Sequence, residues 1–328
     1  MIARMHSSEH TPAWKKIFAN GYIGAADLKH LCLDISQEAL DEINANFPVQ
    51  LTQSLLDQHS LDGNVLRQYL PAQQELINPE GYSADPVGDM DATQQNGVIK
   101  KYNNRVLLIT THNCPVHCRY CFRKDYPYAK DNPNTHQFEN ALDFITKDTS
   151  INEVILSGGD PLSLEDDVLA NLFQSLEKIP HIKTLRLHTK FPSIIPERIT
   201  SDFLNTLKNC KLDKVCVFHI NHPDEISEEF CAAVKQIKAT NTTTLNQSVL
   251  LKNVNDNAET LIQLSQKLFS VGVLPYYLHM LDHARGTHHF HVEKSTANTI
   301  LDIMKSELPG YLVPKFAQEI AGENSKIY

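Results

Sequence analysis

Three cysteines lie close together in the sequence, in a run that begins at Cys114 and continues through Cys118 to Cys121. The proline that follows Cys114 disfavours a helical conformation there, so we expect a loop that wraps around a ligand. Three thiolates can bind three irons of a four-iron cluster and leave the fourth iron open to another molecule. The spacing alone also allows a zinc site, in which His112 or His117 would supply the fourth ligand.

A pair of glycines forms the second candidate feature, in the run Ser157-Gly-Gly-Asp160-Pro, directly after an apolar stretch. Glycines allow a ligand to approach the backbone closely, and their N–H groups can bind a carboxylate. Taken alone, the same run is also typical of an ordinary turn between a strand and a helix.

Six short strands, each followed by a helical stretch, are predicted from the hydrophobic pattern after residue 100. The predicted strands are Val106–Thr110, Glu153–Ser157, Thr184–Thr189, Lys214–His219, Thr243–Val249 and Val273–Leu278. The predicted helices cover residues 138–147, 165–178, 197–208, 226–239, 256–270 and 293–307. This alternation favours parallel βαβ units, so we expect an α/β fold, a partial (β/α)6 barrel. The chemistry of such a barrel lies at the C-terminal ends of its strands.

The first hundred residues lack this alternation of strands and helices, and we divide the chain after residue 96. Residues 12–47 show helical patterning, whereas residues 71–97 are rich in Pro, Gly, Asn and Asp and predict an extended linker or lid. We therefore expect a mainly helical N-terminal accessory region with a linker over residues 1–96, followed by the barrel core over residues 97–328.

Composition argues against several classes of partner. The chain carries 39 acidic and 30 basic residues, a net charge of −9, and no long Lys/Arg run, so no nucleic-acid partner is expected. No stretch approaches the roughly 20 apolar residues of a membrane helix, so we expect no membrane association. The N-terminus lacks the apolar region of a secretory signal, which predicts a cytoplasmic protein.

The cysteine spacing, placed directly after a strand, resembles the radical S-adenosylmethionine (SAM) superfamily. Further stretches resemble the lysine 2,3-aminomutase family and occur in the same order along the chain: Cys118-Arg-Tyr-Cys-Phe-Arg123, His219-Ile-Asn-His-Pro223, Leu245-Asn-Gln-Ser-Val-Leu-Leu251 and Pro275-Tyr-Tyr-Leu-His-Met-Leu-Asp282. The run Tyr311-Leu-Val-Pro-Lys315 is similar to the branch that makes (R)-β-lysine for modification of translation elongation factor P.

The resemblance implies two cofactors at the cysteine loop. Cys114, Cys118 and Cys121 would bind a 4Fe–4S cluster, which receives an electron from an external donor and cleaves SAM to a 5′-deoxyadenosyl radical. The SAM-binding residues implied by the family's motifs are Ser157, Gly158, Gly159, Asp160, His219 and Gln247.

The family also uses pyridoxal phosphate (PLP), whose aldehyde forms an imine with a lysine amine. The resemblance implies that Lys326 is this lysine and a catalytic residue. Lys101 and Arg105 match basic positions that bind the phosphate, to which arginine offers two parallel hydrogen bonds.

Three charged residues are implied as the substrate-binding set. Arg123 matches the residue that binds the substrate carboxylate, and Asp282 matches an acid that binds the side-chain ammonium. Glu319 stands where the family usually has a second acid, an aspartate, so its carboxylate is displaced by about one methylene.

The function implied is an isomerase that converts L-lysine to β-lysine, the R isomer, with a functional link to elongation factor P and its lysine ligase. Three alternatives stay open. The first is an aminomutase for glutamate or arginine, and the second is a radical SAM methyltransferase acting on RNA. The third is a zinc-binding structural module.

Overall fold

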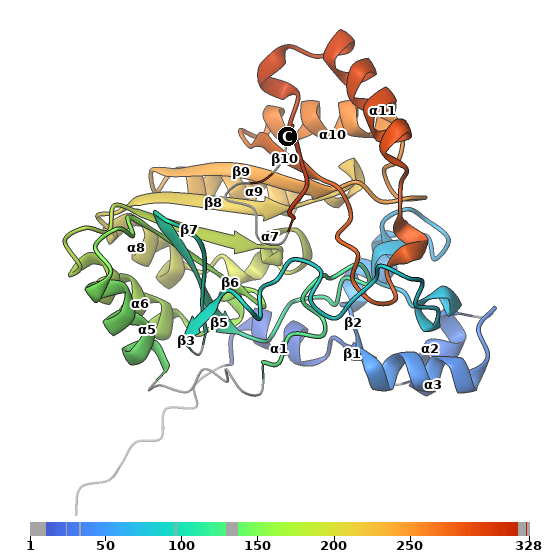
Figure 1. The fold of residues 1–328 in the computed structure, drawn as a ribbon, viewed down its shortest axis with the longest axis horizontal. Helices are drawn as coiled ribbons and strands as arrows, with labels where there is room; N and C mark the ends of the chain where they lie inside the picture. The colour runs from blue at the N-terminus through green and yellow to red at the C-terminus, as the bar shows by residue number, and fades with distance from the viewer. Residues whose placement is uncertain are drawn as a thin grey trace, which may run out of the picture.

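A nine-stranded sheet forms the centre of the computed structural model, which describes residues 11–23, 25–32, 34–95, 97–128, 137–320 and 326 (Figure 1). Its strand order is β11-β10-β9-β8-β7-β6-β5-β4-β3. Neighbouring strands from β5 to β11 are parallel, whereas β3 and β4 continue the sheet antiparallel beyond β5. This arrangement confirms the predicted partial α/β barrel.

The predicted strands and helices of the core are confirmed with boundaries shifted by a few residues at most. The strands are β5 (Arg105–Thr111), β6 (Glu153–Gly158), β7 (Thr184–Thr189), β8 (Asp213–His219), β9 (Thr242–Val249) and β10 (Leu274–His279). The helices that follow them are α5 (Gln137–Lys147), α6 (Asp166–Glu177), α8 (Ser201–Asn209), α9 (Glu228–Lys238), α10 (Ala258–Ser270) and α11 (Lys294–Glu307), with a short α7 (Phe191–Ile194) after β7.

Strands at both edges of the sheet were not predicted. They are β3 (Thr93–Gln95), β4 (Val98–Tyr102) and β11 (Lys315–Ala317). Each is short, and β4 and β11 carry lysines that weaken an apolar strand pattern. Strand β11 pairs in parallel with β10 at one edge of the sheet, and β4 pairs with β5 near the other.

Each core strand presents one face to the covering helices and the other to the interior of the barrel. In β7, buried and half-buried positions alternate, so that Leu185 and Leu187 point toward the helices while Arg186 and His188 point inward. Side-chain caps fix where the helices begin; for example, Ser227 accepts a hydrogen bond from the Phe230 N–H at the start of α9.

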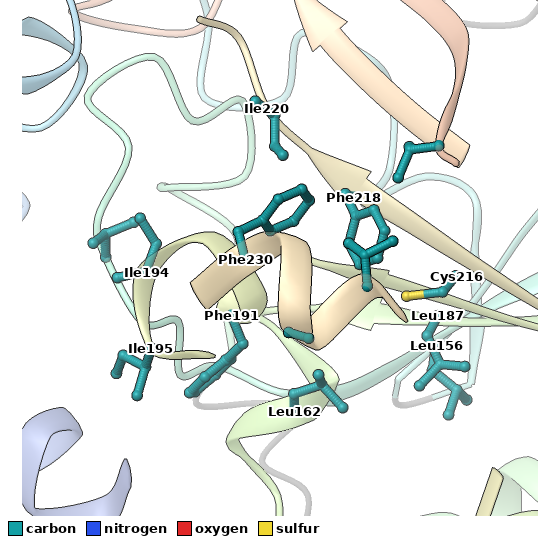
Figure 2. Packing of buried hydrophobic residues seen from close by; sticks show 14 of the residues in the cluster. Leu156, Leu162, Leu187, Phe191, Ile194, Ile195, Cys216, Phe218, Ile220 and Phe230 are labelled. Atoms are coloured by element: carbon teal, nitrogen blue, oxygen red, sulfur yellow. The ribbon is translucent and has the colours of Figure 1, made fainter. Parts of the chain in front are cut away.

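The hydrophobic core lies between the sheet and the helices, and Figure 2 shows its part around Phe191, Phe218 and Phe230. Cys216 packs there beside Leu187 and is 3% exposed, as expected for a small buried hydrophobe. Cys32 and Cys210 are also buried, and Cys231 is half-buried.

The N-terminal region shares this core with the barrel. It comprises α1 (Ala13–Ala19), β1 (Tyr22–Ile23), α2 (Ala25–Leu31), α3 (Gln37–Asn46), β2 (Val49–Gln50) and α4 (Gln53–Gln58). Trp14 of α1 packs edge-on against Phe191 of the barrel, with ring centroids 6.0 Å apart. The division after residue 96 stays a prediction.

The segment of residues 71–97, for which an extended linker or lid is predicted, is largely irregular and contacts the barrel at several points. Val87 is 3% and Asp89 is 1% exposed. The Ser83 N–H donates to the His283 carbonyl after β10. Its Pro, Gly and Asp residues make turns with buried partners, which composition alone does not distinguish from a loose linker.

No helix within the described ranges is both long and apolar enough to span a membrane.

Candidate active site

Residues named from the sequence gather where the parallel strands end. The cysteine loop follows β5, the paired glycines end β6, and His219 ends β8 beside Gln247 of β9, its partner in register. Asp282 follows β10. Since the carboxyl ends of parallel strands lie along one edge, these residues share one mouth of the barrel.

The cysteine loop is held in place by the N-terminal region. The backbone N–H groups of His117 and Arg119 donate to the carbonyls of Gln50 and Gln68, at 2.9 and 2.8 Å. The Arg119 guanidinium, 1% exposed, binds both oxygens of Glu75, with Nε–oxygen distances of 3.0 and 3.1 Å. The accessory region therefore fixes the conformation of the loop that carries the thiols.

The three thiols of this loop lie close enough to influence one another. Burial raises the pKa of all three, that of Cys121 to about 11, and the other two thiols raise the pKa of Cys114 further. Such thiols become thiolates only when a positively charged centre binds them. A set of three soft thiol donors and no carboxylate fits an iron–sulfur cluster.

The zinc alternative finds no support in this geometry. His117 Nδ1 lies 2.7 Å from the Pro48 carbonyl oxygen, and its ring stacks on Phe47 at 4.8 Å between centroids. His117, one of the two candidates for a fourth zinc ligand, is therefore engaged by the N-terminal region.

The paired glycines lie against the end of β5 and the start of the cysteine loop. The Gly159 and Asp160 N–H groups donate to the carbonyls of Thr111 and Asn113, at 2.8 and 2.7 Å, so they do not face a ligand carboxylate. A Cβ on Gly159 would lie 2.7 Å from the His112 carbonyl carbon. Gly158 has φ +106°, which favours glycine. The glycines thus let the β6 turn pack tightly against the start of the cysteine loop.

The carboxylate of Asp160 accepts hydrogen bonds from neighbouring residues of the protein. Its carboxylate accepts hydrogen bonds from the Thr189 hydroxyl at 2.8 and 2.9 Å, from the Lys190 N–H at 2.6 Å and from the Leu162 N–H at 3.0 Å. Burial raises its pKa to about 6. Asp160 therefore positions the turn after β7, and its carboxylate oxygens are engaged there.

His219 lies in a buried hydrogen-bonded network with the cysteine loop. Its Nε2 is 2.8 Å from the Tyr120 hydroxyl oxygen, which accepts a hydrogen bond from the Asn221 amide, also at 2.8 Å. Burial, reinforced by the nearby Lys190 cation, lowers the pKa of His219 to about 3, so the imidazole is neutral.

A second group, the charged cluster, joins residues far apart in the sequence. Lys326 Nζ lies 3.3 Å from Glu319, whose other oxygen is 2.8 Å from Lys101 Nζ. Lys101 also pairs with Asp89 at 2.6 Å, and the second oxygen of Asp89 pairs with Arg123 Nε at 2.5 Å. Four of the residues predicted to bind PLP or substrate thus form one chain of ion pairs.

Asp89 is the member of the charged cluster that the sequence did not reveal. It is almost fully buried, and although burial raises its pKa, Arg123 and Lys101 hold that pKa below its usual value. It stands in the Pro- and Gly-rich segment taken for a linker, with no spacing pattern to mark it. A lone acid in such a segment is indistinguishable from a solvated turn residue.

Asp282 and Lys326 complete the charged cluster. Burial, followed by the Glu319 carboxylate, raises the pKa of Asp282 to about 7. Burial lowers the pKa of Lys326 in spite of Glu319, and its Nζ lies 5.2 Å from the centre of the Tyr277 ring. A lysine amine with a lowered pKa is more readily uncharged and nucleophilic.

Arg105 is the predicted residue that lies apart from the charged cluster. It begins β5, at the opposite end of the strand from the cysteine loop. Its guanidinium lies over the Tyr102 ring, 4.0 Å from the centroid, and donates to the Asn104 side chain.

Comparison with known proteins agrees with this geometry. The family model of the Radical SAM superfamily matches residues 108–265. The chain is 47% identical to the L-lysine 2,3-aminomutase of Haemophilus influenzae over 77% of this chain and 75% of that protein. It is 41% identical to the enzyme of the same name from Escherichia coli K12, over 91% and 89% of the two chains. The corresponding enzyme of Buchnera aphidicola is 44% identical, over 80% and 78%.

These relatives match the chain over most of their own length as well as most of its length. They favour a radical enzyme over the zinc-binding module and the RNA methyltransferase. Membership of the superfamily implies a 4Fe–4S cluster and SAM. The chain belongs to the L-lysine 2,3-aminomutase family of radical SAM enzymes.

Proposed function

We propose that the protein converts L-lysine to β-lysine by a PLP-dependent radical 1,2-amino shift. The observation that carries this proposal is the charged cluster, in which two lysines, an arginine and three acids lie together. The printed names of the relatives support L-lysine as the substrate.

The residues proposed to hold the cluster and SAM lie at one mouth of the barrel. Cys114, Cys118 and Cys121 would each bind one iron, and SAM would lie near Ser157, His219 and Gln247. When bound, the two groups supply a 5′-deoxyadenosyl radical. The chain itself fixes the cysteine loop and keeps His219 neutral. The β6 glycines and Asp160 contribute by shaping the neighbouring turns.

PLP is proposed to be held by Lys326, with Lys101 near its phosphate. The fit rests on the burial of the Lys326 amine, on its lowered pKa and on the aromatic ring of Tyr277 beside it. When bound, PLP supplies an aldehyde that binds the migrating amino group. Arg105, which the resemblance also assigns to the phosphate, lies at the other end of β5 over the Tyr102 ring, so Lys101 is the better placed of the two.

Substrate recognition is proposed to depend on three charged groups. Arg123 would bind the substrate carboxylate, while Asp282 and Glu319 would face the side-chain ammonium. The Glu319 carboxylate contributes to the raised pKa of Asp282, and two acids this close would repel the acidic side chain of glutamate and attract a cation. This favours lysine over the glutamate alternative.

We further propose that the product is (R)-β-lysine and that it serves the modification of elongation factor P in the cytoplasm, through the lysine ligase of that pathway. The proposal rests on the resemblance of residues 311–315 to that branch. An external one-electron donor would reduce the cluster.

Lysine binding should weaken as the pH falls below about 7. The pKa of Asp282 is about 7 before substrate binds, and only its ionised form pairs with an ammonium. Below that pKa, binding must release a proton, so the apparent Kd for lysine should rise by up to roughly tenfold per pH unit. The spectral change of the PLP-loaded enzyme on lysine addition would measure it. Asp282→Asn should remove this dependence; a Kd that stays flat between pH 8 and 6 in the unaltered enzyme would argue against the assignment.

Charge removal at Asp282 and Glu319 tests substrate recognition. We expect Asp282→Asn to lower β-lysine formation at least about 100-fold, because a buried site built for an ammonium loses its counter-charge. SAM cleavage to 5′-deoxyadenosine should change little, since the cysteine loop is untouched. We expect Glu319→Gln to lower turnover about tenfold or more, as two lysines lose their partner, whereas Glu319→Asp should be tolerated.

The exposed acid Asp302, on α11, offers the control for these variants. Asp302→Asn should leave both products unchanged. If Glu319→Gln were silent, Asp282 alone would recognise the side chain. If Asp282→Asn were also silent, free lysine would not be the substrate.

A further inference from the structure

His188 is a histidine of the barrel interior to which no role has yet been given. It lies in β7 on the inward face, between the outward residues Leu187 and Thr189, which are buried. In register it pairs with Val217 of β8, two residues before His219. It therefore faces the same interior as the cofactor and substrate residues proposed above.

The Nε2 atom of His188 is buried and has no hydrogen-bond partner among the described residues. Ring nitrogens of His288, His289 and His291, in the described segment after β10, also lack a partner. By contrast, His219 Nε2 lies 2.8 Å from the Tyr120 hydroxyl, and His181 Nε2 lies 2.9 Å from the Ile145 carbonyl oxygen. A buried polar atom without a partner destabilises a fold, and such atoms are retained mainly where they bind a ligand.

The surroundings of His188 indicate the kind of ligand. Burial and then three cations, Arg186, Lys326 and Arg123, lower its pKa far below the usual value, so the ring is neutral. Each cation has a carboxylate partner of its own. A neutral imidazole can donate one N–H, and among cations the matching acceptor is an anionic oxygen.

We propose that His188 binds an anionic oxygen of the molecule held at Lys326. The oxygen belongs either to PLP, as its phosphate or ring oxygen, or to the carboxylate of the amino acid bound there. This inference rests on the proposed function, because it requires that Lys326 hold PLP.

The test replaces His188 by leucine, which has a similar volume and no hydrogen-bonding atom. PLP binding to the enzyme without substrate is measured by absorbance, and lysine binding to the PLP-loaded enzyme by its spectral change. If the oxygen belongs to PLP, His188→Leu should raise the Kd of PLP about tenfold or more. If it belongs to the substrate, the Kd of PLP should stay unchanged and the Kd of lysine should rise by a similar factor.

Thermal unfolding without PLP separates binding from a structural role. His188→Leu should leave the Tm of the PLP-free protein unchanged or raise it, because no hydrogen bond is lost. The matched control is His181→Leu, which loses a hydrogen bond outside the barrel; its Tm should fall, with both Kd values unchanged. Unchanged Kd values in His188→Leu, with a Tm that falls as in the control, would overturn the inference. An unaltered protein that binds no PLP would instead overturn the proposed function.

Discussion

Replacing Cys114, Cys118 or Cys121 with alanine should abolish both iron loading and SAM cleavage. Each thiol is proposed to bind one iron, and the buried loop offers no other soft donor in its place. Loss of one ligand leaves an iron exposed to solvent, and the cluster decomposes. Iron and sulfide content, the visible absorbance and the release of 5′-deoxyadenosine should all fall to background in each variant.

Two cysteines elsewhere in the fold provide the control. Cys210 ends α8 and Cys231 lies in α9, both on the helical layer outside the sheet. Alanine at either position should leave iron content and SAM cleavage intact, with at most a modest loss of stability. Retained SAM cleavage in a variant of the loop cysteines would contradict the assignment.

Borohydride reduction of the PLP-loaded enzyme should attach the pyridoxyl group to Lys326. The Lys326 side chain is half-buried, its pKa is lowered and its amine lies beside an aromatic ring. Peptide mapping would locate the modification. Lys326→Ala should lose the imine absorbance and reduce β-lysine formation by several orders of magnitude, because the reaction requires the covalently bound cofactor.

Lys315 is the matched control, since it lies close in sequence and is exposed on β11. Lys315→Ala should keep the absorbance band and the activity. A pyridoxyl group found on Lys315 or Lys252, with Lys326 unmodified, would show that the charged cluster is not the PLP site.

The sequence predicted the barrel well because its core strands and helices repeat one strong pattern. The β6 strand, for instance, is a continuous apolar run, and α6 has apolar residues at helical spacing, so burial of one face determines both. Strands β4 and β11 lack that signal. Lys101 of β4 belongs to the charged cluster, so a charged residue interrupts the apolar pattern of that strand.

The candidate site was predicted less completely than the fold. Resemblance named Lys326, Arg123 and Asp282, but it could not show that Asp89 connects Lys101 with Arg123. Those ion pairs join segments that are remote in sequence, and a buried ion pair between such segments produces no recognisable pattern in the local sequence.

The sequence also did not predict how the turn after β6 packs against the cysteine loop. The resemblance implies that the β6 glycines face a ligand, and in the structure the Gly159 N–H and the space beside both glycines are taken up by the end of β5 and the start of the cysteine loop. Both purposes require the same residue type, so only the three-dimensional structure distinguishes them.

The most direct test of the proposed reaction is the product formed from L-lysine. The PLP-loaded enzyme with a reconstituted cluster would be incubated anaerobically with L-lysine, SAM and a one-electron reductant, and the amino acids would be separated by chiral chromatography. We expect (R)-β-lysine to accumulate over many turnovers, with little 5′-deoxyadenosine released per product. Release of 5′-deoxyadenosine without β-lysine, or faster formation of β-glutamate from glutamate in a parallel reaction, would contradict the proposal that this is a lysine 2,3-aminomutase.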